Sequence, residues 1–492
     1  MVTMSGSDTI VASRSRAATH RKIAGAATPD DHVLVIFGAT GDLARRKLLP
    51  GLWHLAETGM MPAAYRIIGV SSDRLSSDDF RGFARHAAEE FGAVKPSAGD
   101  WDAFATRLRY VGGEFRPGSS EPVRRAVHEA ESDLGAARRL FFFAVPPAAF
   151  GEILRGLDEA GLAADARVIM EKPFGTDLAS AKQLNTLVHS VLEEEQVFRI
   201  DHFVGKEAIQ NIAALRFANG MFEPIWNRDH IDHIQIDVPE TLDVAQRVAF
   251  YDATGAFRDM VVTHLFQLLG FLAMEPPPAM DAEGIGAEKV KVFRSLRPLD
   301  PREVVRGQYD GYDALAPGSG TETLVALVAH IDNWRWDGVP ILMRTGKRMA
   351  ADRKLVTIAF REPPRQLFPF ADAAERRHRK DYLTFDFDER GGITASFLAK
   401  KPGPATVLER ATMRFSYEEL GTGVLEAYER LFHDAMIGDK TLFASAEGIE
   451  RLWEVATPLL DAPPRVQRYP QGSWGPEPAV RDLIAPRRWV LP

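Results

Sequence analysis

One histidine of this chain lies within an otherwise apolar stretch that predicts a buried helix. Residues 258–269 are mostly apolar, yet they include Asp259 and His264. A buried helix carries such groups only where hydrogen bonds satisfy them, because an unpaired polar group in the interior is costly. For a lone histidine, a hydrogen bond to a backbone carbonyl is the simpler interpretation. A histidine oriented by a carboxylate is also the usual general base, since the pKa of histidine lies near neutrality.

A second polar cluster precedes a predicted amphipathic helix. Asp201, His202 and Lys206 come just before residues 209–217, in which apolar residues recur at helical spacing. Positive side chains beside the start of a helix form a receptor for a phosphate monoester. A capping and surface cluster is the alternative interpretation of any one of these residues.

The first predicted strand leads into a glycine turn. Residues 32–37 form a continuous apolar, β-branched run, as expected of a strand buried on both faces. Gly38 and Gly41 follow, and then a helical pattern in which Pro50 predicts a kink or a break. A strand, a glycine turn and a helix form a phosphate-binding unit, because the helix start offers free N–H groups. The spacing is not G-x-G-x-x-G, so a plain tight turn is the alternative.

Further strands alternate with helical patterns and predict a parallel, doubly wound sheet with a dinucleotide site at its carboxyl edge. These strands cover residues 66–70, 140–145 and 167–170. In such a sheet the end of the second strand reads the adenosine ribose, where an acid favours NAD and an arginine favours NADP. Here that end carries both an acid and a base, so the choice between NAD and NADP stays open. The alternative interpretation is that these are ordinary solvated loop residues without a role in cofactor binding. The residues are Ser72, Asp73 and Arg74.

Together these features predict the oxidation of a sugar hemiacetal. Such a reaction needs a base for the C1 hydroxyl proton, a nicotinamide for the C1 hydride, and groups that hold the sugar. A His–Asp pair, a dinucleotide-binding unit and cationic residues on a phosphate supply the three, and no metal is required. His230 and His233, which lie in a strand-like segment, are interpreted as surface or edge residues and not as metal ligands.

The second half of the chain has a different pattern. Strand-like segments follow one another without intervening helices, which predicts an antiparallel or mixed sheet with one covered face. Residues 364–380 predict a loop, and residues 426–433 a helix that closes the domain. The predicted fold is therefore an α/β Rossmann-type unit followed by a larger α+β domain with a mainly antiparallel sheet. We expect a disordered tail over residues 1–30, the dinucleotide-binding domain over 31–200, and the substrate-binding and dimerisation domain over 201–492.

The composition excludes several classes of protein. The 492 residues are 45% hydrophobic and 26% charged, which is typical of a globular chain with a sizeable core. A net charge of −8 argues against broad nucleic-acid binding, which needs clustered Lys and Arg. The chain has no cysteine, so disulfides, cysteine–zinc sites, iron–sulfur clusters and thiol nucleophiles are excluded.

The sequence also bears on the location of the protein. No apolar run approaches the roughly 18 residues of a transmembrane helix, so no membrane partner is expected. The first 30 residues are rich in Ser, Ala and Thr with scattered basic residues; an organellar transit peptide is the alternative to a disordered tail. A cytoplasmic location is the default expectation.

Several long motifs resemble those of the glucose-6-phosphate dehydrogenase family, in the same order along the chain. The similarity runs from about residue 31 to the C-terminus. The motifs are GATGDLARRKLLP from Gly38, EKPFG from Glu171, RIDHFVGKE from Arg199, DVPET from Asp237, YD at Tyr251, RDMVVTHLFQ from Arg258, AMEPP from Ala273 and RTGKRM from Arg344.

The resemblance implies a role for each matching residue. It implies that His264 is the general base and that the Asp201 carboxylate pairs with it. It also implies that His202 and Lys206 bind the substrate phosphate, and that Pro173 follows a cis peptide bond. Residues implied to contact the sugar are Lys172, Glu240, Asp259 and Lys347, with Lys172 also beside the nicotinamide; those implied at the dinucleotide turn are Gly38, Thr40, Gly41, Asp42 and Leu43.

Three positions depart from the family pattern. Phe203 stands where the family has a tyrosine, which removes one phosphate hydrogen bond worth about 1–2 kcal/mol. Val262 and Thr263 stand where the family has Gln-Asn before the base. Ser72 stands where many members have an arginine that binds the NADP 2′-phosphate. We therefore expect a weaker preference for NADP than is usual in the family, with use of NAD or of both cofactors. Arg74 or Arg46 could supply the missing positive charge.

The function implied is the oxidation of D-glucose 6-phosphate to 6-phospho-D-glucono-1,5-lactone with NADP or NAD, the first step of the oxidative pentose phosphate pathway. A paralogue acting on another aldose phosphate, or one that prefers NAD, is the second interpretation. A non-catalytic sugar-phosphate or dinucleotide-binding regulator is the third. The resemblance also implies a homodimer or homotetramer formed through the large sheet.

Overall fold

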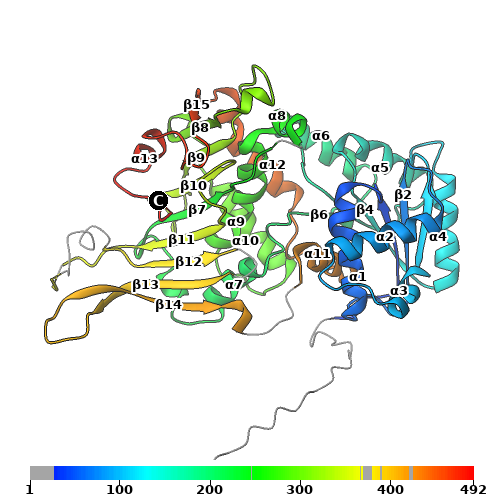
Figure 1. The fold of residues 1–492 in the computed structure, drawn as a ribbon, viewed down its shortest axis with the longest axis horizontal. Coiled ribbons are helices and arrows are strands. Elements are labelled where there is room, and N and C mark those ends of the chain that lie inside the picture. Colours follow the sequence, from blue (N-terminus) through cyan, green and yellow to red (C-terminus); the bar gives the residue numbers. More distant parts are fainter. Residues whose placement is uncertain are drawn as a thin grey trace, which may run out of the picture.

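The computed structural model describes residues 27–244, 247–365, 367–369, 379–387, 391–419 and 425–491. Most of the predicted N-terminal tail, and much of the loop expected over residues 364–380, lie outside the described residues. The remainder folds into two halves, each built on its own sheet (Figure 1).

The first sheet has six parallel strands in the order β3-β2-β1-β4-β5-β6. Its central strand β1 is buried along its whole length, as its apolar sequence predicts. The strand order reverses between β1 and β4, so the loops after these two strands diverge and leave a crevice for a ligand. The strands are β1 (His32–Phe37), β2 (Tyr65–Ser71), β3 (Leu108–Gly112), β4 (Arg138–Phe143), β5 (Arg167–Met170) and β6 (Val197–Arg199).

Helices connect these strands, and two details differ from or refine the prediction. Apolar residues at helical spacing predict a helix over about residues 177–195, but the helix ends at His189, and a short 3₁₀ turn, η3 (Glu194–Gln196), follows. The chain is not broken at Pro50: the backbone stays helical, and the π-helical segment η1 (Ala44–Leu48) continues into α1 with Pro50 in its first turn. The helices are α1 (Leu49–Glu57), α2 (Ser77–Phe91), α3 (Ala98–Ala105), α4 (Glu121–Leu134), α5 (Phe150–Glu159) and α6 (Leu178–His189).

The second sheet has nine strands in the order β14-β13-β12-β11-β7-β10-β9-β8-β15. Two pairs, β7 with β10 and β8 with β15, are parallel, and the others are antiparallel, which confirms a mixed, mainly antiparallel sheet. The strands are β7 (Ile231–Pro239), β8 (Val304–Tyr309), β9 (Leu324–Ala329), β10 (Ile341–Gly346), β11 (Leu355–Phe360), β12 (Tyr382–Asp386), β13 (Gly392–Lys400), β14 (Leu408–Ser416) and β15 (Val466–Tyr469).

The interpretation of His233 as a surface or edge residue is wrong. Strand β7 lies in the middle of the sheet and is covered on both faces, so His233 is buried. Its ring bonds to Asp232 through Nδ1 (2.7 Å) and to Gln235 through Nε2 (2.9 Å). His230, just before the strand, is exposed as expected.

The helices of the second half include the one that carries His264. The continuous stretch from α8 through η6 to α9, Val248–Ala273, is long and apolar enough to cross a membrane, but 83% of its most apolar window is buried within the protein. The helix α11 packs on α1 of the first half and does not simply close the second domain (Figure 1). The elements are α7 (Glu207–Phe217), α8 (Val248–Ala256), η6 (Phe257–Leu265), α9 (Phe266–Ala273), α10 (Ala282–Ser295), α11 (Ala427–Ile437), α12 (Ala446–Asp461) and α13 (Ala479–Leu483).

Candidate active site

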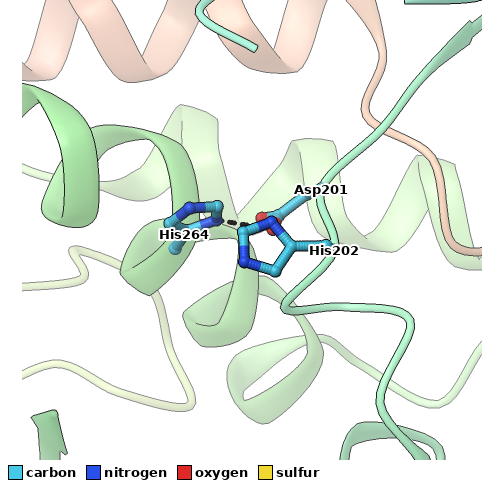
Figure 2. A group of neighbouring side chains, drawn as sticks. All are labelled: Asp201, His202 and His264. Carbon is cyan, nitrogen blue, oxygen red and sulfur yellow. Dashed lines mark hydrogen bonds and ion pairs between the residues drawn. The ribbon is translucent and has the colours of Figure 1, made fainter. Parts of the chain in front are cut away.

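A buried histidine–aspartate pair lies where the two halves of the molecule meet. Asp201 follows β6 of the first sheet, and His264 projects from the π-helical segment η6. The His264 Nδ1 and Asp201 Oδ1 atoms are 2.6 Å apart (Figure 2). The backbone N–H of Phe203 donates to the same carboxylate oxygen at 2.9 Å. The carboxylate is thereby held in place and accepts from the imidazole.

Burial and hydrogen bonds fix the protonation pattern of this pair. Burial raises the pKa of Asp201, but its close contact and hydrogen bond with His264, together with the Phe203 N–H, outweigh burial, and the net pKa lies below its ordinary value. Asp201 is therefore a carboxylate, and His264 Nδ1 is the donor in their hydrogen bond. The opposite nitrogen, Nε2, is left as an acceptor, which is the arrangement that a general base requires.

Lys172 lies against the accepting nitrogen of the histidine. Its ammonium group donates to His264 Nε2 at 2.6 Å and to Asp259 Oδ1 at 2.8 Å. Burial alone would raise the pKa of Asp259, but the Lys172 charge lowers it to about 2. Lys172 follows β5, and the peptide bond to Pro173 is cis, as the family resemblance implies. Residues from three distant segments therefore converge on one polar centre.

The residues expected to receive a phosphate lie beside the pair. The His202 ring centre is 4.9 Å from that of His264, in an edge-on arrangement. Burial and nearby positive charges hold the pKa of His202 well below its ordinary value. Phe203 stacks on the His264 ring at 4.5 Å, and the Lys206 ammonium is 5.3 Å from the Phe203 ring centre. Phe203 therefore supports the base, whatever its missing hydroxyl costs in phosphate binding.

Glu240 and Lys347 form an ion pair near this centre. The two residues follow β7 and β10, which run parallel, so their carboxyl ends meet at one edge of the sheet. The Glu240 N–H also donates to the Gly346 carbonyl at 2.9 Å. Lys347 contributes to the low pKa of Asp259, which places the pair within electrostatic reach of the sugar-binding positions.

Two further residues of the site were missed by sequence reasoning. Burial raises the pKa of Glu171 to about 7, and its carboxylate accepts from the Tyr428 hydroxyl. The Tyr428 ring lies nearly parallel to that of His202, with ring centres 6.1 Å apart. Glu171 could have been found from its place beside Lys172 in a recognised motif. Tyr428 comes from α11, and no local pattern indicates that this helix reaches the site.

The site also has the composition of a possible metal-binding cluster. Asp201, His202 and His264 each place one ligand atom within 4.8 Å of the others (Figure 2). The hydrogen bond between Asp201 Oδ1 and His264 Nδ1 already uses one such atom of each residue. The geometry is that of an oriented base, and the expectation that no metal is required stays a prediction.

The glycine turn after β1 fits a dinucleotide. Gly38 has φ +80°, and a Cβ at this position would lie 2.2 Å from the Ala144 carbonyl oxygen, so only glycine permits the close approach. The helical stretch that begins at Asp42 leaves its first N–H groups free for a pyrophosphate. The Thr40 hydroxyl donates to Asp73 Oδ2 at 2.5 Å, which ties the turn to the end of β2.

The end of β2 presents an acid to the position of the adenosine ribose. Ser72, Asp73 and Arg74 are all exposed there. A carboxylate suits a free ribose 2′-hydroxyl, and serine offers no charge for a 2′-phosphate. The guanidinium of Arg46 lies over the Phe91 ring, 5.6 Å from its centre.

Comparison with known proteins identifies the family of this chain. Residues 35–211 match the family profile "Glucose-6-phosphate dehydrogenase, NAD binding domain", and residues 213–489 match "Glucose-6-phosphate dehydrogenase, C-terminal domain". The chain is 40% identical over 471 residues to glucose-6-phosphate 1-dehydrogenase of Rhizobium meliloti, covering 91% of this chain and 94% of the relative. 

Solved structures give the same result. The chain resembles the X-ray structure of glucose-6-phosphate 1-dehydrogenase from Mycobacterium avium, with a TM-score of 0.84, 36% identity and coverage of 95% and 99% of the two chains. It also resembles a glucose-6-phosphate dehydrogenase in complex with its substrate glucose-6-phosphate, with a TM-score of 0.85, 31% identity and coverage of 93% and 98%. The domain boundary near residue 200 stays a prediction. The chain belongs to the glucose-6-phosphate dehydrogenase family.

Proposed function

We propose that this protein oxidises the C1 hemiacetal of D-glucose 6-phosphate to 6-phospho-D-glucono-1,5-lactone, using a nicotinamide dinucleotide. The observation that carries this proposal is the buried His264–Asp201 pair, in which the nitrogen turned away from Asp201 accepts from the Lys172 ammonium group. A regulator that only bound sugar phosphate would not need an oriented base at this position.

Different residues of the chain carry out different parts of the reaction. His264 Nε2 takes the proton of the C1 hydroxyl, and Asp201 stabilises the imidazolium that forms. Lys172 now bonds Nε2, so it must shift toward the substrate or Asp259 to free that lone pair. When bound, the nicotinamide dinucleotide supplies the acceptor for the C1 hydride. Loss of the proton and the hydride leaves a C1=O double bond, which is the lactone carbonyl.

The side chains around the base bind the substrate. His202 and Lys206 receive the phosphate, and arrival of a dianion favours protonation of a histidine that is otherwise kept neutral. Glu240, Asp259 and Lys347 lie where they can bond the sugar hydroxyls. Fixing the sugar between these two groups holds C1 next to His264, which removes much of the entropic cost of the reaction.

We further propose that the enzyme uses NAD as well as NADP. Support comes from the exposed Asp73 carboxylate, held by Thr40 at the end of β2, and from Ser72 in place of a cationic side chain. The carboxylate can bond a ribose 2′-hydroxyl but repels a 2′-phosphate. Arg74, also exposed, supplies the positive charge that keeps NADP acceptable.

We also propose that the chain self-associates through its nine-stranded sheet. Among the described strands, β14 is the last at one edge of the sheet, and it exposes Met413, whose relative accessibility is 63%. Open edges and exposed apolar side chains on them favour pairing with another chain. Light scattering coupled to size exclusion should give a mass of two or four chains; a monomer at micromolar concentration would contradict this.

The function is tested by initial rates of nicotinamide reduction with glucose 6-phosphate and either NADP or NAD. Free glucose and other hexose phosphates are the controls. Turnover that is fastest with glucose 6-phosphate is the expected result. A folded protein that binds dinucleotide but turns over no sugar phosphate would refute the proposal, and faster turnover of another aldose phosphate would identify a paralogue.

A further inference from the structure

A small cavity borders the His264–Asp201 pair. Its volume is about 20 Å³, measured as space open to the centre of a water molecule, and one water needs roughly 10–15 Å³ on that measure. Most of the wall is apolar: Phe174, Ile200, Val262, Ala444, Ile449 and Leu452. The wall also includes the polar side chains of Asp201 and Gln267.

Each of these two side chains has a buried oxygen without a donor. Asp201 Oδ1 accepts from both His264 and Phe203, whereas Oδ2 accepts from no described residue. Gln267 Oε1 likewise has no partner among the described residues. Both side chains are more than nine-tenths buried, with relative accessibilities of 4% and 3%. A buried oxygen left in this way costs about 1–3 kcal/mol, and more when it is charged.

The other polar donors that line the cavity already have partners. The Trp453 N–H donates to the Phe174 carbonyl at 3.0 Å, and the Thr263 hydroxyl donates to the Asp259 carbonyl. The Lys172 ammonium is engaged by Asp259 and His264. A water molecule has two O–H donors and is small enough for the cavity, so it is the simplest donor for the two oxygens.

We propose that a single buried water donates to Asp201 Oδ2 and Gln267 Oε1, and that Gln267 is thereby a positioning residue for the catalytic pair. Asp201 is held on one oxygen by His264 and Phe203 and on the other by this water, so its carboxylate plane cannot rotate away from the imidazole. Gln267, one helical turn beyond His264 along the same apolar stretch, anchors the water. This role rests on the proposed function, because it concerns the base of that reaction.

Two variants should remove the water by different means. Gln267→Met keeps the side-chain length and removes the acceptor, and Val262→Ile keeps Gln267 but fills the cavity. Each is expected to lower kcat about tenfold, as for loss of one hydrogen bond to a charged group, with KM for both substrates changed less than about twofold. Since they act on one water, their effects should not multiply in the double variant. Leu452→Met, a volume-conserving change in the apolar wall, is the matched control and should leave kcat unchanged.

The pH profile separates positioning from packing. Without the water, the Asp201 charge is less shared and stabilises the imidazolium more, so the acid limb of the kcat/KM profile should move to higher pH by about half a unit. The other titratable groups that face the pair are the same in every variant, so they do not contribute to the difference between the profiles: Glu171, Lys172, His202, Asp259, Lys289 and Tyr428. A variant that loses thermal stability but keeps the wild-type kcat and acid limb would overturn the proposal.

A high-resolution crystal structure of the full chain provides an independent test. A water peak within hydrogen-bonding distance of both oxygens, lost in Gln267→Met, is expected. A Gln267 amide that donates directly to Asp201 Oδ2, with no water between them, would overturn the proposal. This result does not depend on turnover, so failure of the proposed function, seen as an inactive wild type, is distinguishable from failure of this inference.

Discussion

The ammonium nitrogen of Lys172 lies 2.6 Å from Nε2 of His264, the one imidazole nitrogen that Asp201 leaves free. The base is thus occupied by a cation until substrate arrives. A hydroxyl that displaces Lys172 gains both an acceptor for its proton and a neighbouring positive charge for the oxygen from which that proton leaves. Asp259 also binds Lys172, so it can hold the ammonium group after the hydroxyl has displaced it from His264.

Removal of the base should abolish most turnover without abolishing binding. His264→Asn is expected to lower kcat by about 10²-fold or more, because it removes the proton acceptor. Calorimetric affinity for glucose 6-phosphate should change little, since the phosphate and sugar groups remain. His230→Asn, a change to an exposed histidine outside the site, is the control. Turnover retained in His264→Asn would mean that another group is the base.

Restoring a hydroxyl at position 203 should tighten binding of the phosphate. Phe203→Tyr keeps the ring that stacks on His264 and adds a donor, so KM for glucose 6-phosphate should fall about five- to thirtyfold, as for 1–2 kcal/mol. The rate with free glucose, which has no phosphate, should not improve. Phe203→Leu, which loses the stacking, should instead lower kcat. An unchanged KM in Phe203→Tyr would show that the new hydroxyl does not reach the phosphate.

A positive charge at the end of β2 should shift cofactor choice toward NADP. Ser72→Arg can bind a 2′-phosphate through charge-assisted hydrogen bonds, so kcat/KM for NADP should rise about tenfold or more while that for NAD changes little. Ser190→Arg adds the same charge at the exposed end of α6 and should have no such effect. A wild-type ratio of NADP to NAD efficiency already in the thousands would contradict the proposal of dual use.

The buried lysine of α10 should make stability depend on alkaline pH. Burial lowers the pKa of Lys289 to about 8, from 10.5 in an unfolded chain. The unfolded chain therefore binds more protons between these values, and stability rises with pH across this window. The difference of about 2.5 units corresponds to roughly 3 kcal/mol of destabilisation at neutral pH. Lys289→Met should remove this cost.

Urea unfolding of the wild type and Lys289→Met at pH 7 and pH 10 measures the effect. The variant should gain more stability over the wild type at pH 7 than at pH 10. Lys291→Met, a change to an exposed lysine on the same helix, is the control and should show little difference between the two pH values. A gain from Lys289→Met that is the same at both pH values would show that this lysine titrates normally.

Local patterns in the sequence predicted the elements that carry the site. The apolar run of β1 and the glycine turn at Gly38 are properties of a few neighbouring residues, and both appear in the structure. The polar residues inside the apolar stretch of His264 indicated a site for the same reason: burial of such groups demands a partner. The family motifs then identified candidates for that partner.

The tertiary structure alone decided which distant segments meet. His233 is buried because β7 happens to be central in its sheet, and Tyr428 reaches His202 because α11 packs on α1. The raised pKa of Glu171 and the cavity between Asp201 and Gln267 likewise depend on atoms from several elements. Periodicity and residue type set the conformation of each segment, whereas burial and charge at a site sum over contacts between segments that are remote in the chain.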